Sequence, residues 1–513
     1  MVGYVLSAGA IPRQPLGIID QRVTETAGLE SSELPPDERS MLAGTFTEWL
    51  TDGVERSAMR VPRAVITSLV RLWLVLVGFL SGTLLAEEKG HWPSFRGPGA
   101  AGVADGMDLP ERWDAQTGQG IRFQVPIPGL AHSSPVIWGD RLFVTTAVSS
   151  EREATFKPGL YGSGEASRDR SVQEWRIFCL NKQSGKLLWE KTATKGTPKD
   201  ERHLKSSYAN SSPVTDGERV VTLFGSEGLF CHTVQGEFLW RKDLGRLDVG
   251  AYDLPSYEWG AASSPIIHEG KVIVQCDQQK GSFLLAADLK TGRTLWMTQR
   301  DEPPSWGTPT VYPAKTRAEL VANGSNFIRG YDPETGAELW RLGGSSKITA
   351  PTPVYAEGLI IVASGRAPER PIFAIRPGAV GDITLRDNET SNQSVAWSKT
   401  RRGGYMPTPL IYRSLVYVLN NDGLFGCYDL KTGAEHYLER VPHRSFGFSA
   451  SPVAADGRIY LAGEDGLVFV LQAGTAMKLL ATNPIGESLM ATPALSDRTL
   501  YLRGSRHLIA VGK

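Results

Sequence analysis

The stretch ASSPIIHEGKVIVQCDQQKGSFLLAADLKTGRTLW, residues 262–296, contains one complete copy of a pattern that recurs along the chain. A Ser-Pro step leads into a short apolar run, and the turn HEG leads into the alternating segment KVIVQC. A third apolar segment ends in a polar turn, and a fourth segment ends at Trp296. Short apolar segments separated by polar, Gly-containing turns predict four consecutive β-strands.

The Ser/Thr-Pro step occurs eight times between residues 92 and 513. Its prolines are Pro135, Pro213, Pro265, Pro309, Pro353, Pro409, Pro452 and Pro493. The fourth segment of a unit often ends in tryptophan, at Trp189, Trp240, Trp296, Trp340 and Trp397, with Tyr437 as a substitute. Four short strands in each unit of about 40–50 residues are typical of a β-propeller blade. The repeat therefore predicts an all-β, eight-bladed β-propeller.

The last unit has three strand segments before the chain ends at Lys513. The segment TGQGIRFQVPI, residues 117–127, matches the fourth-strand pattern, with Phe123 at the tryptophan position. Pairing this segment with the C-terminal strands would close the ring and remove its open sheet edges. We expect residues 87–513 to form one closed propeller whose last blade is built from both ends of the domain.

Composition excludes several classes of protein. The 55 Lys and Arg balance the 55 Asp and Glu, so the charge gives no general case for nucleic-acid binding. The four cysteines are scattered, with no C-x-x-C pair, which predicts neither a disulfide scaffold nor a metal site. No G-x-S-x-G, H-E-x-x-H or P-loop motif supports hydrolysis or nucleotide use. We expect a monomer.

The N-terminal part predicts export. Arg60, Arg63 and Arg71 precede an apolar run from Leu72 to Ala86, which fits a secretory signal peptide over residues 59–86. An uncleaved inner-membrane anchor is the alternative reading of the same segment. Residues 1–58 carry four Arg and nine Asp or Glu, and we interpret them as a mis-called or disordered acidic extension. The expected location is periplasmic or secreted.

The segment AADLKTGRTLW, Ala286–Trp296, resembles the tryptophan-docking pattern A-x-D-x-x-T-G-K-x-x-W of the pyrroloquinoline-quinone-like (PQQ-like) β-propeller repeat family. GYDPETGAELW and CYDLKTGAEHY are weaker copies, and HWPSFRGPGAAGVADG resembles the first segment of secreted members from planctomycete-type bacteria. We expect each tryptophan to pack on the neighbouring blade and to donate its N–H to a carbonyl. The expected docking residues are Asp288, Thr291, Gly292, Trp296, Asp332, Gly336, Trp340, Trp189 and Trp240.

The resemblance implies two kinds of function. One branch of the family contains quinoprotein alcohol dehydrogenases, which bind PQQ and Ca²⁺ in the central funnel and typically carry a vicinal Cys-Cys disulfide. The other contains non-catalytic propellers, including the scaffold lipoprotein of the outer-membrane β-barrel assembly machinery. No two cysteines are adjacent in this chain. We expect a non-catalytic scaffold without a cofactor, which binds a protein, small molecule or glycan; the alternative is a PQQ-dependent alcohol or polyvinyl-alcohol dehydrogenase.

A binding site in such a fold would be the funnel formed by residues just before the Ser/Thr-Pro steps. The candidates are His132, Asn210, Glu258, Trp259, Trp306 and Tyr405. The loop at residues 192–207 is basic and that at 241–258 is acidic. One interpretation is a funnel for an anionic or sugar-like ligand; the other is solvated loops around aromatic residues that plug the core. Asn210 and Glu258 could ligate Ca²⁺ through oxygen, and no catalytic residue can be assigned.

Overall fold

The computed structural model describes residues 90–151, 154–159, 161, 166–254, 257–313, 317–443 and 446–512. The predictions for residues 1–58 and 59–86 concern segments outside these residues. Within the described part, no helix has the length and apolar character needed to cross a membrane.

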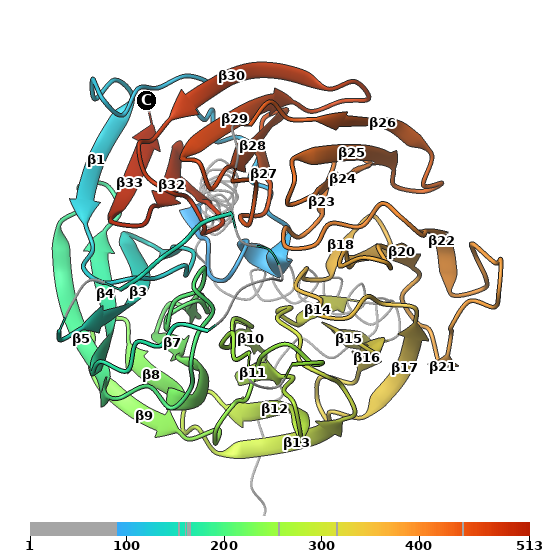
Figure 1. The fold of residues 1–513 in the computed structure, drawn as a ribbon, viewed down its shortest axis with the longest axis horizontal. Coiled ribbons are helices and arrows are strands. Elements are labelled where there is room, and N and C mark those ends of the chain that lie inside the picture. Colours follow the sequence, from blue (N-terminus) through green and yellow to red (C-terminus); the bar gives the residue numbers. More distant parts are fainter. Residues whose placement is uncertain are drawn as a thin grey trace, which may run out of the picture. The chain divides into compact units, whose positions relative to one another are not determined.

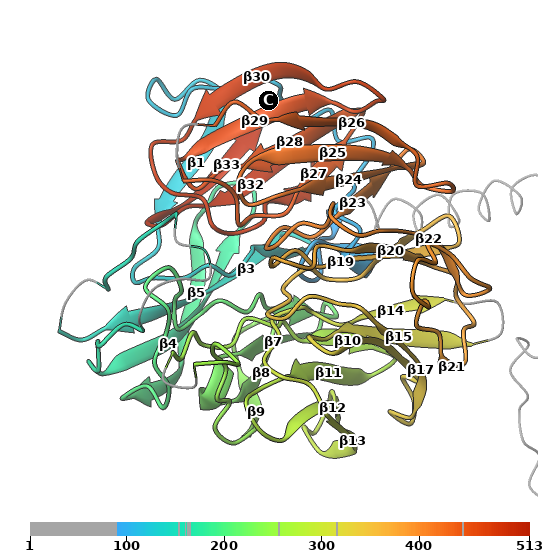
Figure 2. The ribbon, with the colours of Figure 1, turned by 45° about the vertical axis from the view of Figure 1, so that its right-hand side comes forward.

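Eight antiparallel sheets are arranged around a central axis (Figure 1), and the predicted eight-bladed propeller is confirmed. Blade 1 contains β2 (Val136–Trp138), β3 (Arg141–Ser149), β4 (Gln173–Asn181) and β5 (Leu187–Gly196), and blade 2 contains β6 (Val214–Thr215), β7 (Arg219–Leu223), β8 (Leu229–Thr233) and β9 (Phe238–Lys242). Blade 3 contains β10 (Ile266–His268), β11 (Lys271–Cys276), β12 (Ser282–Asp288) and β13 (Thr294–Arg300). Blade 4 contains β14 (Thr310–Pro313), β15 (Ala318–Asn323), β16 (Phe327–Tyr331) and β17 (Glu338–Gly343). Blade 5 contains β18 (Val354–Ala356), β19 (Leu359–Ala363), β20 (Ile372–Ile375) and β22 (Val395–Lys399). Blade 6 contains β23 (Leu410–Tyr412), β24 (Leu415–Leu419), β25 (Leu424–Asp429) and β26 (Glu435–Arg440). Blade 7 contains β27 (Val453–Ala455), β28 (Arg458–Ala462), β29 (Leu467–Gln472) and β30 (Lys478–Pro484). The short strand β21 (Gly381–Asp382) pairs in parallel with β17 at the outer edge of blade 4 (Figure 2).

Blade 8 is built from both ends of the propeller. It contains β31 (Ala494–Ser496), β32 (Thr499–Arg503), β33 (His507–Gly512) and, as its outer strand, β1 (Ile121–Pro126). β1 pairs antiparallel with β33 over the register Phe123↔Ala510 to Pro126↔His507. Phe123 lies over the turn of blade 1, since a Cβ on Gly185 would lie 2.7 Å from its ring. The ring therefore carries no open edge at this blade.

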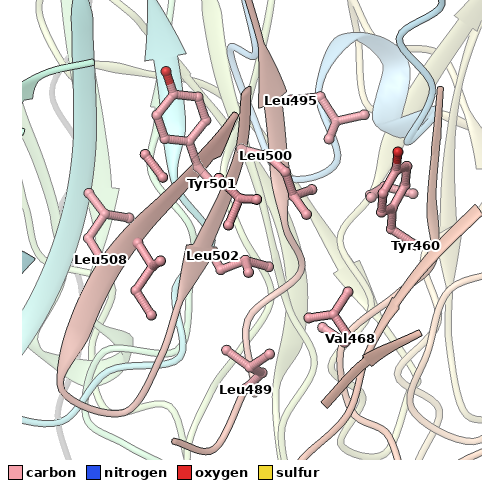
Figure 3. Close-up of a cluster of buried hydrophobic side chains, with 14 of the residues drawn as sticks. Tyr460, Val468, Leu489, Leu495, Leu500, Tyr501, Leu502 and Leu508 are labelled. Atoms are coloured by element: carbon pink, nitrogen blue, oxygen red, sulfur yellow. The ribbon is translucent and has the colours of Figure 1, made fainter. Parts of the chain in front are cut away.

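The hydrophobic core lies between neighbouring blades. In Figure 3, Tyr460 and Val468 of blade 7 and Leu500, Leu502 and Leu508 of blade 8 belong to one buried cluster. The middle strands of a blade are covered on both faces, as the uninterrupted burial of β32 shows. Burial on both faces explains why these strands are rich in Val, Leu and Ile.

Tryptophans of the outer strands connect blades 1, 2 and 3 to the blade that follows each of them. The indole N–H of Trp189, Trp240 and Trp296 donates to the carbonyl of Val234, Leu289 and Pro333, respectively, at 3.0, 3.0 and 3.1 Å. The ring of Trp296 covers Gly336, which has a φ of 72°, and a Cβ there would lie 2.5 Å from it. The turn is held by its aspartate and threonine: Asp288 accepts from the Thr291 N–H and hydroxyl at 2.8 and 2.6 Å, and Asp332 accepts from the Thr335 N–H.

Trp340 is bonded differently. Its N–H donates to the Glu319 carboxylate at 3.0 Å, within its own blade. The same Glu319 also accepts from the Gly378 N–H at 2.8 Å, in the long connection between β20 and β22 of blade 5. This connection replaces the Asp-x-x-Thr-Gly turn that receives the tryptophan in blades 3 and 4.

The segment around η2 (Pro98–Ala100) crosses the centre of the ring (Figure 1). Arg96 is fully buried there and donates to the carbonyls of Pro452, Pro409 and Ala100 at 2.8, 3.0 and 3.0 Å. Trp92 pairs with Ile137, a residue that follows a Ser-Pro step. The segment therefore lies on the side of the Ser/Thr-Pro steps opposite to the predicted funnel, and it closes that side of the channel.

Candidate functional site

A ring of hydroxyl groups surrounds the central channel. In seven joints, the backbone N–H of the Ser or Thr before the proline donates to the hydroxyl of the equivalent residue in the next blade. These bonds are Ser134 to Ser212, Ser212 to Ser264, Ser264 to Thr308, Thr308 to Thr352, Thr352 to Thr408, Thr408 to Ser451 and Ser451 to Thr492, at 2.9–3.2 Å. This explains the Ser or Thr of seven of the eight steps, all except Ser134, and the strict repeat of the hydroxyl residue could have indicated this role.

Next to this ring lies a cavity of about 220 Å³. Of the predicted funnel residues, it brings together His132, Asn210, Trp259, Trp306 and Tyr405, whereas Glu258 is outside its lining. The other lining residues include the hydroxyl ring, Phe95 of the segment that closes the channel, Tyr161, His203, Lys205, Ile348, Met406, Ser449 and Met490. Phe95 therefore bounds the cavity on the side that the segment around η2 closes.

Aromatic rings form one wall of the cavity. Trp259 and Trp306 lie with ring centroids 5.9 Å apart, and His203 meets Trp259 edge-on at 5.7 Å. The Trp306 N–H donates to the Gly260 carbonyl at 2.8 Å, which fixes the orientation of its ring. Tyr405 packs in the same cluster with Trp259 and Ile348. Such rings offer flat apolar surface to a ligand.

Lys205 of the wall forms a buried ion pair with Glu464, which lies behind the lining and which the sequence did not reveal. Lys205 Nζ lies 2.7 Å from Glu464 Oε1, and both side chains are almost fully buried. Glu464 also accepts from the Tyr161 and Ser449 hydroxyls and from the Gly159 N–H. Burial lowers the pKa of Lys205 to about 8, and the ammonium lies 3.3 Å from the centre of the Tyr161 ring. Glu464 belongs to the segment GEDG, which has the composition of a turn, and no motif there indicated a site.

Two histidines complete the wall beside Lys205. His132 Nε2 donates to the Lys205 carbonyl at 2.9 Å, and Lys205 N–H donates to His203 Nδ1 at 3.1 Å. Burial lowers the pKa of His132 to about 3, so this imidazole is neutral near pH 7. The His132 imidazole therefore adds a hydrogen-bonding group without positive charge.

The two predicted Ca²⁺ ligands do not converge. The amide oxygen of Asn210 accepts from the Ser207 N–H and hydroxyl at 3.0 and 2.8 Å. The Glu258 carboxylate accepts from the Glu201 N–H and is paired with Arg246. Both groups have internal partners, and only Asn210 lines the cavity.

The basic character expected of the funnel loops is largely neutralised. Lys195 pairs with Glu174 at 2.9 Å and Arg402 with Glu435 at 2.6 Å. Lys205, the one Lys or Arg in the described lining, is paired with Glu464. The cavity wall is therefore polar and aromatic, without an uncompensated charge.

Comparison with known proteins gives one family and several structural neighbours. A family model described as outer membrane protein assembly factor BamB, a PQQ-like repeat family, matches residues 173–439 and 324–473. Tetrathionate hydrolase of Acidithiobacillus ferrooxidans is 23% identical over 390 residues, 70% of this chain and 69% of the relative. A europium-containing methanol dehydrogenase (11% identity, 83% and 92% coverage, TM-score 0.53) and quinohemoprotein alcohol dehydrogenase from Comamonas testosteroni (11%, 83% and 81%, 0.52) share the fold.

The fold of these dehydrogenases implies a quinone and a metal ion, and the described lining does not fit them. Ca²⁺ requires six to eight oxygen ligands, with carboxylates prominent among them, but the lining contains neither Asp nor Glu. The four cysteines are free, buried and distributed over blades 1, 2, 3 and 6, so they offer no vicinal disulfide against a quinone.

Proposed function

Because the chain belongs to the PQQ-like repeat family described as outer membrane protein assembly factor BamB, we propose that it is an exported, non-catalytic propeller that binds an uncharged, sugar-like ligand in its central cavity. The single observation that carries this proposal is the chemistry of the cavity wall. Trp259, Trp306 and Tyr405 supply aromatic surface, and the hydroxyl ring, Asn210 and His132 supply polar groups. Sugars combine an apolar ring face with many hydroxyl groups, and this wall matches both features.

The charges of the side chains in the cavity wall favour a neutral ligand over an anion. A relative, tetrathionate hydrolase, acts by its name on tetrathionate, which is a dianion. An anion of this kind would require a cation that faces the cavity without a partner. The ammonium of Lys205 is already compensated by Glu464, and the His132 imidazole is neutral. The same absence of carboxylates in the described lining speaks against a calcium-dependent dehydrogenase.

The export part of the proposal depends on the segment from Met59 to Ala86. Arg60, Arg63 and Arg71 followed by an apolar run are the feature that supports it. N-terminal sequencing of the native protein is expected to give a chain that begins near Glu87. A peptide from residues 1–58 in the mature protein would contradict the proposal.

Ligand binding can be tested through Trp306, whose ring lines the cavity. Titration of the purified protein with a panel of neutral oligosaccharides is expected to give saturable binding. Because an aromatic contact contributes about 0.5–1.5 kcal/mol, Trp306→Ala should weaken that binding by about 2- to 10-fold. Trp189→Phe, on the outer strand β5 and away from the cavity lining, is the matched control and should bind normally. Equal affinity of Trp306→Ala and the native chain would contradict the assignment.

A further inference from the structure

Arg503 is a buried cation that has no hydrogen-bond partner among the described residues. It ends β32 in blade 8, the residue is 1% exposed, and none of its three guanidinium nitrogens has a hydrogen-bond partner. Burial lowers the pKa of Arg503 to about 10, which leaves the group protonated at neutral pH. A buried charged group without partners is costly, so folded proteins normally provide acceptors for it.

Other buried arginines of the propeller have acceptors. Arg96 donates to three carbonyls in the centre of the ring. Arg202 donates to the Ser206 and Thr155 carbonyls, both at 2.8 Å, and Arg300 is paired with Asp277 at 2.7 Å. The Glu487 carboxylate interacts electrostatically with Arg503. Its oxygens, however, accept hydrogen bonds from residues 505–507. The lack of partners is therefore particular to Arg503 among these four arginines.

In blades 3 and 4 the equivalent position carries an amide side chain that forms bonds to the next blade. Continuing the strand registers by two residues places Gln275 of blade 3 and Asn323 of blade 4 in the same layer as Arg503. Gln275 Nε2 donates to the Asn323 carbonyl at 3.0 Å, and Asn323 Nδ2 donates to the Pro351 carbonyl at 2.8 Å. In blades 3 and 4 a polar side chain of this layer therefore joins two blades, whereas the Arg503 guanidinium of blade 8 forms no such bond.

Arg503 faces the joint between blade 8 and blade 1. Tyr501, two residues earlier and hence on the same face of β32, donates its hydroxyl to the Lys182 carbonyl of blade 1 at 3.0 Å. The hydroxyl ring is interrupted at this joint, because among the described residues no bond joins the Thr492 N–H to the Ser134 hydroxyl. The unpartnered Arg503 guanidinium thus belongs to the joint at which the ring bond between Thr492 and Ser134 is not formed.

We propose that the joint between blades 8 and 1 is a binding site for a compact inorganic anion of the size of chloride, bound by Arg503 together with the Thr492 N–H and the Ser134 hydroxyl. The guanidinium nitrogens are enclosed, so the occupant is small. Ser134 and Thr492 line the central cavity, which gives the anion a route from solvent. The anion supplies acceptors where the Ser/Thr ring lacks a bond, and it stabilises the joint at which the two ends of the propeller meet.

The test is the melting temperature of the full chain in sodium chloride and in sodium gluconate at equal ionic strength. A specific anion stabilises the folded state by mass action, and we expect a saturable rise of about 1–3 °C in chloride over gluconate for the native chain. Arg503→Met should abolish this difference. Arg498→Met, which removes an exposed arginine from β31–β32 of the same blade, should keep it.

Equal melting temperatures of the native chain in the two salts would overturn the proposal and leave ordered water as the partner of Arg503. A chloride effect that persists in Arg503→Met would overturn it as well. If Arg503→Met does not fold, crystals of the native chain soaked in bromide provide an independent measurement. An anomalous peak at hydrogen-bond distance from the Arg503 guanidinium is expected, and its absence would refute the site.

Discussion

Trp240→Ala is expected to lower the free energy of unfolding by about 3–5 kcal/mol, which is the usual cost of truncating a buried aromatic side chain. Trp240 is 7% exposed, belongs to the cluster between blades 2 and 3, and donates its N–H to Leu289. Its ring covers Gly292, where a Cβ would lie 2.7 Å away and where φ is 71°. The substitution removes the ring, its hydrogen bond and the cover over this turn at once.

Phe238→Ala is the matched control for this prediction. Phe238 lies on the same strand, β9, two residues earlier, and its side chain is largely exposed. We expect a loss below about 1 kcal/mol, because most of its surface is already in contact with water. Denaturant unfolding measures both variants. Equal losses in the two would show that the docked tryptophan does not connect the blades.

Glu464→Leu is expected to lower the free energy of unfolding by about 3–5 kcal/mol, the range for breaking a buried ion pair. Lys205 would become an unpaired buried ammonium. The hydroxyls of Tyr161 and Ser449 and the Gly159 N–H would lose their common acceptor. A leucine has a similar volume but offers no acceptor, so the cost arises from the donors that remain.

Two comparisons make this measurement specific. Lys205→Met in the Glu464→Leu background removes the unpaired charge and should recover part of the loss. Glu435→Leu breaks the more exposed pair with Arg402 and should cost at most about 1 kcal/mol. Urea unfolding of the native chain and the three variants measures these differences. A Glu464→Leu chain as stable as Glu435→Leu would contradict the role assigned to the buried pair.

Much of the fold could be predicted because the same short sequence motifs recur from blade to blade. The Ser/Thr-Pro step begins each inner strand, and a Thr-Gly turn precedes the docked residue, as at Gly292 and Gly336. Trp340 shows where the repeat is insufficient, since its N–H bonds to Glu319. An irregular connection in blade 5 displaced the expected acceptor, and a pattern averaged over blades carries no information about one irregular blade.

The site was only partly predictable for a similar reason. Position before the Ser/Thr-Pro step was enough to place His132, Trp259, Trp306 and Tyr405 in the cavity wall. It was insufficient for Glu258, whose carboxylate is held by Arg246 and the Glu201 N–H. Glu464 was missed because its partners come from blade 1 and blade 2 segments about 260–305 residues away. Side-chain partners across blades depend on three-dimensional packing, which no single repeat unit encodes.

The central claim is that the cavity binds a neutral ligand and carries out no quinone chemistry. Its most direct test is one tryptophan-fluorescence titration of the full chain with two sets of ligands, neutral oligosaccharides and PQQ with Ca²⁺, followed by a dye-linked alcohol oxidation assay. We predict saturable binding of an oligosaccharide that is weakened by Trp306→Ala, and no alcohol oxidation after addition of PQQ and Ca²⁺. Saturable, calcium-dependent PQQ binding with turnover of alcohol would contradict the account.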